Sequence, residues 1–186
     1  MKTVYFATHN KGKLLMAREI VKELKLPLSI KHLDVEYPED KSVEDFSHIA
    51  KTGAKFCAEK YKKPVFTTDV GIEIEILSGF PGINTAFTLK RIGVEGIVKL
   101  MEGKKNRKIR ACLALSYCRP GGNPRVWRGE INGTIPKSPR GEKGFGWDPI
   151  FIPEKSDITF AEDPKIRNKV FSFREGISEM YKWLQK

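Results

Sequence analysis

Apolar and polar positions along the chain repeat with two periods, one typical of strands and one typical of helices. Alternating or continuous runs rich in β-branched and aromatic residues predict strands at 3–8, 65–68, 71–77, 109–117, 125–131 and 150–152. Apolar residues three and four positions apart predict helices over 11–24, 42–61, 93–101 and 170–184. Proline, glycine and asparagine at 120–124 predict a hairpin between two of the strands. This order indicates an α/β fold with a mixed central β-sheet and flanking helices.

Length and composition indicate one folded unit. The chain has 186 residues, 40% of them hydrophobic, which is enough for one well-filled core, so we expect a single domain over 1–186. No apolar run approaches the roughly 18 residues of a membrane span, and the first residues predict a strand rather than a signal peptide. The scattered cysteines, Cys57, Cys112 and Cys118, suit reduced thiols in a cytoplasmic protein and lack metal-ligand spacing.

The charge balance is strongly basic. The excess of 34 Lys and Arg over 23 Asp and Glu gives a net charge of +11, which favours polyanionic partners such as nucleotides and nucleic acid. A lysine-rich solvated surface explains the same numbers. No RNA-recognition signature is present in the sequence, so a dedicated RNA-binding protein is not favoured.

A first candidate site lies at residues 8–13 (THNKGK), between the first strand and the first helix. Backbone N–H groups at a helix N-terminus bind anions, and Lys13 adds a positive charge there. Lys13 is in register with Ala17 and Ile20, so we expect it to point toward the buried side. A cation at this end of a helix is unfavourable unless an anion binds nearby, which favours a phosphate ligand. The alternative is a frayed first turn with a solvated lysine.

Two carboxylates form the second candidate site. Asp69 follows the predicted strand 65–68 and precedes Gly71, and the carboxyl end of a strand in an α/β sheet is where ligands gather. Glu39 lies in a loop just before a predicted helix. With nearby lysines the two would suit Mg²⁺ and a polyphosphate, because Mg²⁺ takes a few carboxylates plus phosphate oxygens. Each has a simpler interpretation, Asp69 as a turn cap and Glu39 as a surface acid.

The third candidate is the stretch at 144–151 (GFGWDPIF). Glycines on both sides of Phe145 let the backbone approach a flat ligand, and an aromatic ring there can stack on a base. Asp148 only accepts hydrogen bonds when ionised and suits the N–H edge of a purine. A tight turn with core aromatics is the alternative.

Further motifs accompany this one. In chain order the set is THN–K at 8–13, DVG at 69–71, GFPG at 79–82, GFGWDPIF at 144–151, TFAE at 159–162 and SFR at 172–174. The set resembles the inosine triphosphate pyrophosphatase family nearly end to end. The resemblance implies a mixed α/β fold with two lobes around a cleft, a homodimer, and Mg²⁺-dependent hydrolysis of inosine, deoxyinosine and xanthosine triphosphates. The products would be nucleoside monophosphate and pyrophosphate.

The resemblance also implies roles for particular residues. It assigns the triphosphate to Thr8, Asn10, Lys13 and Lys51. It assigns metal binding and water activation to Glu39 and Asp69. It assigns the base to Phe145, Trp147, Asp148 and Arg174.

The chain departs from the family pattern at several of these motifs. Met16 stands where the family commonly has Glu, Thr68 and Val70 replace an acidic residue and a hydroxyl, Asn168 stands where Lys is usual, and Phe173 replaces His. Phe173 lies on the apolar stripe of the last helix, so we expect it in the core, unable to hydrogen-bond a purine. The leading hypothesis is a nucleoside triphosphate pyrophosphatase that sanitises the nucleotide pool. The alternative is a weakened or inactive descendant that binds nucleotides or nucleic acid.

Overall fold

The structure, a computed structural model, describes residues 2–170 and 173–186, without the side chains of 168–170. Its sheet has seven strands: β1 (Lys2–Ala7), β2 (Leu28–Leu33), β3 (Val65–Ile74), β4 (Pro81–Gly82), β5 (Lys108–Cys118), β6 (Arg125–Thr134) and β7 (Ile152–Pro153). The strand order is β2-β1-β3-β5-β6-β7, and β4 pairs with β3. β1 is parallel to β2 and β3, whereas β4 and β7 are antiparallel to their neighbours. The mixed sheet and the hairpin between β5 and β6 are therefore confirmed.

The chain divides into two compact units. The first contains Met1–Asp69, Leu113–Gly129 and Ser172–Lys186, and the second contains Val70–Cys112 and Glu130–Phe171. Strands β3, β5 and β6 each begin in one unit and end in the other. Each unit is therefore built from segments that are far apart in the sequence.

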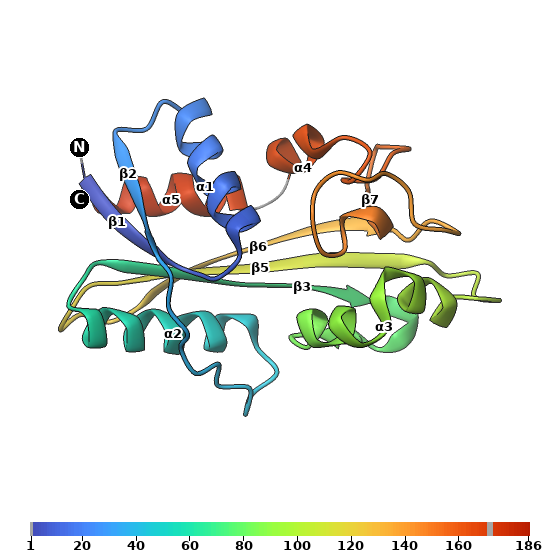
Figure 1. Ribbon diagram of the computed structural model, residues 1–186, viewed down its shortest axis with the longest axis horizontal. Helices are drawn as coiled ribbons and strands as arrows, with labels where there is room; N and C mark the ends of the chain where they lie inside the picture. The colour runs from blue at the N-terminus through green and yellow to red at the C-terminus, as the bar shows by residue number, and fades with distance from the viewer. Residues whose placement is uncertain (1, 171–172) are drawn as a thin grey trace. The chain divides into compact units, whose positions relative to one another are not determined.

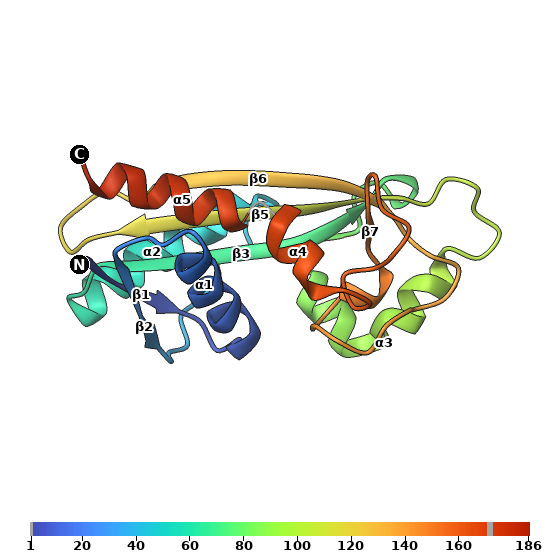
Figure 2. The same cartoon turned by 90° about the horizontal axis from the view of Figure 1, so that it is seen from above.

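In the first unit, helices cover both faces of the strands. Helix α1 (Lys11–Glu23) and helix α5 (Phe173–Leu184) lie side by side on one face, and α2 (Phe46–Tyr61) lies on the other (Figures 1 and 2). The rings of Phe6 and Phe66 stack with centroids 4.3 Å apart, and the Phe173 ring lies 6.0 Å from that of Phe6. Phe173 is 1% exposed, so its predicted place in the core is confirmed.

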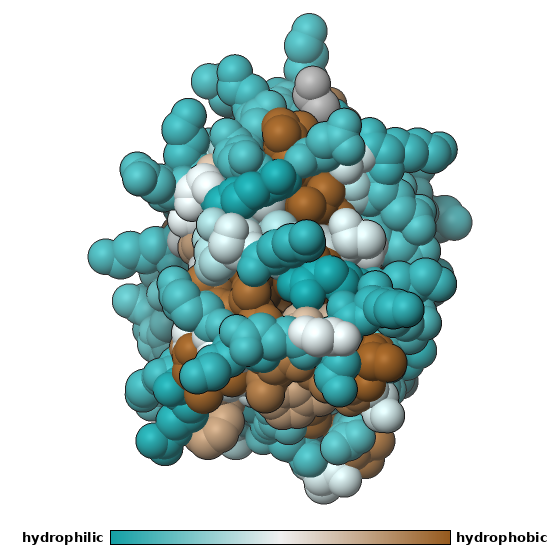
Figure 3. All heavy atoms as spheres, turned by 90° about the vertical axis from the view of Figure 1, so that its right-hand side faces the viewer, coloured by the Kyte–Doolittle hydropathy of each residue, from teal (hydrophilic) through white to brown (hydrophobic). Residues whose placement is uncertain are grey.

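The second unit carries helix α3 (Thr85–Leu100), helix α4 (Pro164–Val170) and an aromatic core. The rings of Phe151 and Phe160 stack with centroids 5.0 Å apart, and Trp147 lies 5.2 Å from Phe151. Figure 3 shows apolar side chains gathered in patches on one face. The large apolar side chains that this unit exposes are Ile76, Phe80, Phe87, Ile92, Leu100 and Ile158.

Two strand predictions need correction. The sequence predicts separate strands at 65–68 and 71–77, whereas β3 runs unbroken from Val65 to Ile74 and a 3-10 turn follows at Glu75–Leu77. Residues 150–152 divide between a 3-10 turn at Asp148–Ile150 and strand β7. Strand β2 was not predicted: residues 28–31 alternate apolar and polar, but His32 breaks this short pattern, and the parallel pairing with β1 defines the strand.

Helix boundaries also differ from the predicted ones. Helix α2 begins at Phe46 rather than at residue 42, because the Asp45 side chain caps it by accepting from the Ser47 N–H at 2.8 Å. Helix α3 consists of two helical parts on either side of a kink at Gly93, whose backbone is not helical; the second part corresponds to the predicted helix 93–101, and the first part, from Thr85, was not predicted. The predicted closing helix over 170–184 is confirmed for 173–184 by α5; Val170 is the last residue of α4, and residues 171–172 lie outside the described residues. Among the described residues, no helix is long and apolar enough to cross a membrane.

Candidate active site

The first turn of α1 is held by the two polar residues that precede it. Asn10 is the N-cap, and its Oδ1 accepts from the Lys13 N–H at 3.0 Å. The Thr8 hydroxyl oxygen accepts from the Asn10 N–H at 3.1 Å, and the Thr8 carbonyl lies 2.8 Å from Nε2 of His32. The loop between β1 and α1 is therefore ordered by its own side chains before any ligand binds.

Lys13 is half-buried within the first unit, on the same side of α1 as the buried residues Ala17 and Ile20. Burial lowers the pKa of its ammonium group below the ordinary value, while the charges of Asp69 and Glu39 oppose this shift. Helix α1 has no acidic residue in its first turn, so its own sequence does not balance this cation. Lys13 and the two carboxylates whose charges act on it therefore belong to the same unit.

Asp69 differs from its predicted setting, because it lies inside β3 and not after a strand end. Its side chain is half-buried, and the residue before it, Thr68, is 8% exposed. The Thr68 hydroxyl is buried without a hydrogen-bond partner in the described part of the chain. A buried hydroxyl in this condition costs free energy unless a ligand or water contacts it. The adjacent Thr67 donates to the Ala50 carbonyl at 2.7 Å and joins β3 to α2.

Glu39 lies in the loop before α2, where its exposed carboxylate pairs with Lys41 at 3.2 Å. The Tyr37 ring anchors this loop on α2, because a Cβ added to Gly53 would lie 2.5 Å from Cε2 of that ring. Burial and then the charge of Glu39 raise the pKa of the Tyr37 hydroxyl well above its ordinary value. Lys51 projects from α2 as an exposed cation.

The donor atoms of this cluster are compatible with Mg²⁺. The described residues contain no group of three or more His, Cys, Asp or Glu side chains that could hold a metal without further ligands. Mg²⁺ usually binds one or two carboxylates and completes its shell with water and substrate phosphates. The oxygens of Asp69 and Glu39 beside Lys13 fit that pattern, and they do not fit a metal cage made only of protein.

The glycine-rich motif of the second unit is folded around Asp148, which is 2% exposed. Its Oδ2 accepts from the Phe145 N–H at 2.8 Å, and a Cβ on Gly144 would lie 2.2 Å from the same oxygen. Burial raises the pKa of the Asp148 carboxyl, while Arg167 and the Phe145 N–H oppose this shift. Trp147 is 9% exposed and packs against Phe151, whereas Phe145 is half-buried.

Arg167 is the residue of this region that the sequence analysis missed. It is 7% exposed, and its Nη1 donates to Oδ2 of Asp148 at 2.5 Å. A usable signal was present, since Arg167 lies on the same short segment as Asn168, where the family pattern expects a cation. The side chain of Asn168 lies outside the described residues.

Arg174, the predicted purine-reading arginine, belongs to the first unit. Its Nη1 donates to Oε2 of Glu23 at 2.6 Å, so α5 is joined to α1 by an ion pair. Its side chain is 28% exposed. The predicted site residues therefore divide between the units, with Phe145, Trp147 and Asp148 in the second and the others in the first.

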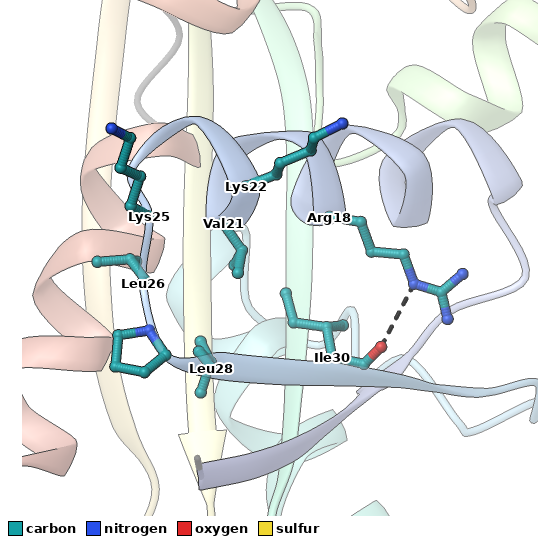
Figure 4. Close-up of a pocket in the computed structure, with 8 residues that line it drawn as sticks. Arg18, Val21, Lys22, Lys25, Leu26, Leu28 and Ile30 are labelled. Carbon is teal, nitrogen blue, oxygen red and sulfur yellow. Dashed lines mark hydrogen bonds between the residues drawn. The ribbon is translucent and has the colours of Figure 1, made fainter.

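The structure contains a further hollow of about 430 Å³ in the first unit, which none of the predicted site residues lines. Val21, Leu28 and Ile30 form its apolar wall, and Arg18 donates to the Ile30 carbonyl at 3.3 Å (Figure 4). Lys22 and Lys25 extend away from it (Figure 4).

Comparison with known proteins places the chain in a family. Residues 4–182 match the Ham1 family. The chain belongs to this family. A dITP/XTP pyrophosphatase of Methanopyrus kandleri is 47% identical over 159 residues, covering 86% of this chain and 83% of its own length. One of Thermococcus kodakarensis is 37% identical over 182 residues, covering 97% and 96%. The resemblance inferred from the motifs is thereby confirmed.

Solved Ham1 structures support the fold. The Staphylococcus aureus Ham1 protein superposes with a TM-score of 0.81 at 24% identity, covering 99% of this chain and 98% of its own. A Coxiella burnetii HAM1 protein gives 0.80 at 22% identity, covering 100% and 99%. The mixed sheet with flanking helices is thus the Ham1 fold.

Proposed function

We propose that this Ham1 protein hydrolyses deoxyinosine, inosine and xanthosine triphosphates to nucleoside monophosphate and pyrophosphate, and so removes deaminated purines from the nucleotide pool. One observation carries the proposal: Lys13 is half-buried at the start of α1, behind the Asn10 cap, in the unit that also holds Asp69 and Glu39. A chain 47% identical over most of its length to a dITP/XTP pyrophosphatase supports the choice of substrate.

Residues at the start of α1 would bind the triphosphate. Thr8 and Asn10 order the loop, and Lys13 supplies a cation whose charge is disfavoured by burial until an anion arrives. A polyphosphate near Lys13 would stabilise its charged form and restore its pKa. Lys51 adds a second, exposed cation from α2.

Asp69 and Glu39 would hold Mg²⁺ and position water. When bound, Mg²⁺ supplies charge neutralisation on the phosphate oxygens. Asp69 would orient a water molecule for attack on the α-phosphorus and accept its proton. The water oxygen forms a bond to the α-phosphorus, the bond from this phosphorus to the oxygen that bridges to the β-phosphorus breaks, and pyrophosphate leaves with the bonding electron pair. The products are nucleoside monophosphate and pyrophosphate. Catalysis of this type depends on positioning and on preorganised charge, so the half-buried Asp69 is the residue on which it depends most.

The base is assigned to the remaining residues. Phe145 supplies a ring face, Asp148 supplies an acceptor for purine N–H groups, and Trp147 supports the motif from the aromatic core. Arg174 is also proposed to contact the base; in the structure it forms an ion pair with Glu23.

The experiment that tests the proposal measures pyrophosphate release by the purified protein from deoxyinosine, xanthosine and standard triphosphates with Mg²⁺. We expect turnover of the deaminated substrates, its loss in Asp69→Asn, and its loss on chelation of the metal. Nucleotide binding without turnover would favour the alternative, a non-catalytic descendant, which the departures at Thr68 and Val70 support.

We also propose that the protein is a cytoplasmic homodimer. Three free, buried cysteines suit a reducing compartment. Phe87 on α3 is 57% exposed and Phe80 is 43% exposed, and exposed apolar clusters mark association surfaces. Light scattering after gel filtration measures the mass, and Phe87→Asp should shift a dimer toward monomer.

A further inference from the structure

Arg167 makes two contacts at once within the second unit. Its Nη1 donates to Oδ2 of Asp148 at 2.5 Å, and the centre of its guanidinium lies 4.5 Å from the centroid of the Phe145 ring. A guanidinium is a planar cation that both stacks on aromatic faces and pairs with carboxylates. Arg167 therefore uses both of its recognition modes here.

A purine bound as proposed would use the same two groups. It would stack on Phe145 and donate an N–H to the carboxylate of Asp148. Asp148 is only 2% exposed, and its Oδ2 already accepts from both Arg167 and the Phe145 N–H. With Arg167 in place, Oδ2 has two donors and the guanidinium covers the face of the Phe145 ring that it contacts, so a base that uses the same oxygen and the same ring face must displace it.

The arrangement is incompletely bonded. Nε of Arg167 is buried and has no hydrogen-bond partner in the described ranges 2–170 and 173–186. A buried donor without an acceptor is unfavourable, so this placement of the side chain is less stable than a fully bonded one. A ligand that displaces the guanidinium removes no hydrogen bond at Nε.

We propose that the Arg167 guanidinium is an internal competitor of the purine base, held on Phe145 and Asp148 until a base displaces it. This inference rests on the proposed function, because it concerns the same base-binding residues. The apparent affinity for a purine nucleotide is then the intrinsic affinity multiplied by the fraction of molecules in which Arg167 has left. The reduction is the same for every purine, since the competitor leaves before any base is read.

The principal test is Arg167→Lys, which keeps a positive charge near the buried Asp148 but removes the planar stacking group. Binding of deoxyinosine monophosphate and deoxyadenosine monophosphate to the full chain is measured by calorimetry. We expect both dissociation constants to fall by a similar factor, roughly tenfold, with their ratio unchanged. The matched control is Arg140→Lys, because Arg140 also has a buried Nε without a partner among the described residues but pairs with Glu162.

A second measurement uses the wild-type protein and does not depend on the variant folding. With ¹⁵N-labelled arginine, saturation with deoxyinosine monophosphate should shift the Arg167 Nε–H resonance and leave that of Arg140 in place. An unmoved Arg167 signal at saturation overturns the inference.

The remaining outcomes separate the inference from the proposed function. If the wild type hydrolyses deoxyinosine triphosphate but Arg167→Lys binds the monophosphate more weakly, Arg167 is a base ligand and only the inference fails. If the wild type neither hydrolyses deaminated triphosphates nor binds the monophosphate, both fail.

Discussion

Nε2 of His48 lies 2.7 Å from Oδ2 of Asp40, and this contact joins the loop that carries Glu39 to helix α2. The other oxygen of Asp40 accepts from the Ser42 hydroxyl at 2.6 Å. Asp40 therefore connects the loop both to its own next residues, through Ser42, and to α2, through His48. Lys51, which is proposed to bind phosphate, follows His48 by about one helical turn of α2. The contact between Asp40 and His48 therefore joins the loop of Glu39 to the helix that carries Lys51.

We predict that Asp40→Asn lowers the stability of the fold above pH 3.8 and weakens its dependence on pH between 3.8 and about 2. Hydrogen bonds from Ser42 and then His48 lower the pKa of Asp40 from 3.8 to about 2. In the folded state the Asp40 carboxylate takes up a proton at a lower pH than in the unfolded state. The stabilisation is therefore complete above pH 3.8 and is lost as the pH falls through about 2. Melting temperatures measured across this range should decline less steeply in the variant. An identical decline in both proteins would show that the contact does not stabilise the fold.

Asp69→Asn should lower kcat by about 10²–10⁴-fold, as expected for loss of a group that transfers a proton. The amide keeps the size of the carboxylate, so the melting temperature should change little. Pyrophosphate release and thermal melting are measured on the same preparation. Glu73→Gln in the same strand is a matched control, because Glu73 pairs with Arg110 in the second unit. Normal turnover in Asp69→Asn would remove this residue from the mechanism.

Lys13→Met should weaken triphosphate binding and stabilise the free protein. A charge-assisted phosphate contact contributes about 1.5–3 kcal/mol, so KM should rise roughly 10–100-fold. Burial lowers the Lys13 pKa in the folded state, so the unfolded state binds more protons and wild-type stability increases with pH up to the ordinary value of 10.5. The variant should melt at a higher temperature at pH 7 and lose this pH dependence. Unchanged KM would make Lys13 a structural residue.

Phe173→His should cost stability without sharpening purine selectivity. The Phe173 ring is 1% exposed and lies 6.0 Å from the ring of Phe6, so an imidazole would be buried with unsatisfied nitrogens. We expect a loss of about 2–4 kcal/mol in the free energy of unfolding. Denaturant melts measure this loss, and the ratio of kcat/KM for inosine triphosphate over ATP measures selectivity. A wider ratio in a stable variant would place position 173 in the base site.

In the wild type, we predict that the same ratio is smaller than in relatives that carry His at this position. Phe173 cannot donate to a purine carbonyl, and stacking on Phe145 tolerates every base. Parallel assays with a His-bearing relative measure the difference. Equal ratios would mean that Asp148 and its neighbours read the base alone.

Sequence periodicity was sufficient where one face of an element is buried. The bounds of α1 and β1 follow from the regular spacing of residues such as Val4 and Ile20, which are 1% exposed. Periodicity did not predict elements that are defined by pairing with another segment of the chain. The alternation in β2 covers only residues 28–31 before His32 breaks it, and the strand is defined by six register pairs with β1.

The candidate site was predictable in part for the same reason. Motif order identified Lys13, Glu39 and Asp69, and their electrostatic coupling lies within one unit. The Arg167 contact with Asp148 and the Arg174 pair with Glu23 depend on which side chains meet in space. Spacing along the chain does not encode such pairings, so these two side-chain contacts could not be predicted.

The division of the first unit into three segments determines when during synthesis it can be completed. Every proposed catalytic residue is within the first 69 residues, yet α5, which packs on α1, is synthesised after the whole of the second unit. When the ribosome has added residue 171, the second unit has been fully translated, whereas the first unit still lacks its closing helix. The unit that begins first is therefore completed second, and the proposed catalytic residues wait for a helix that is made more than 100 residues after Asp69.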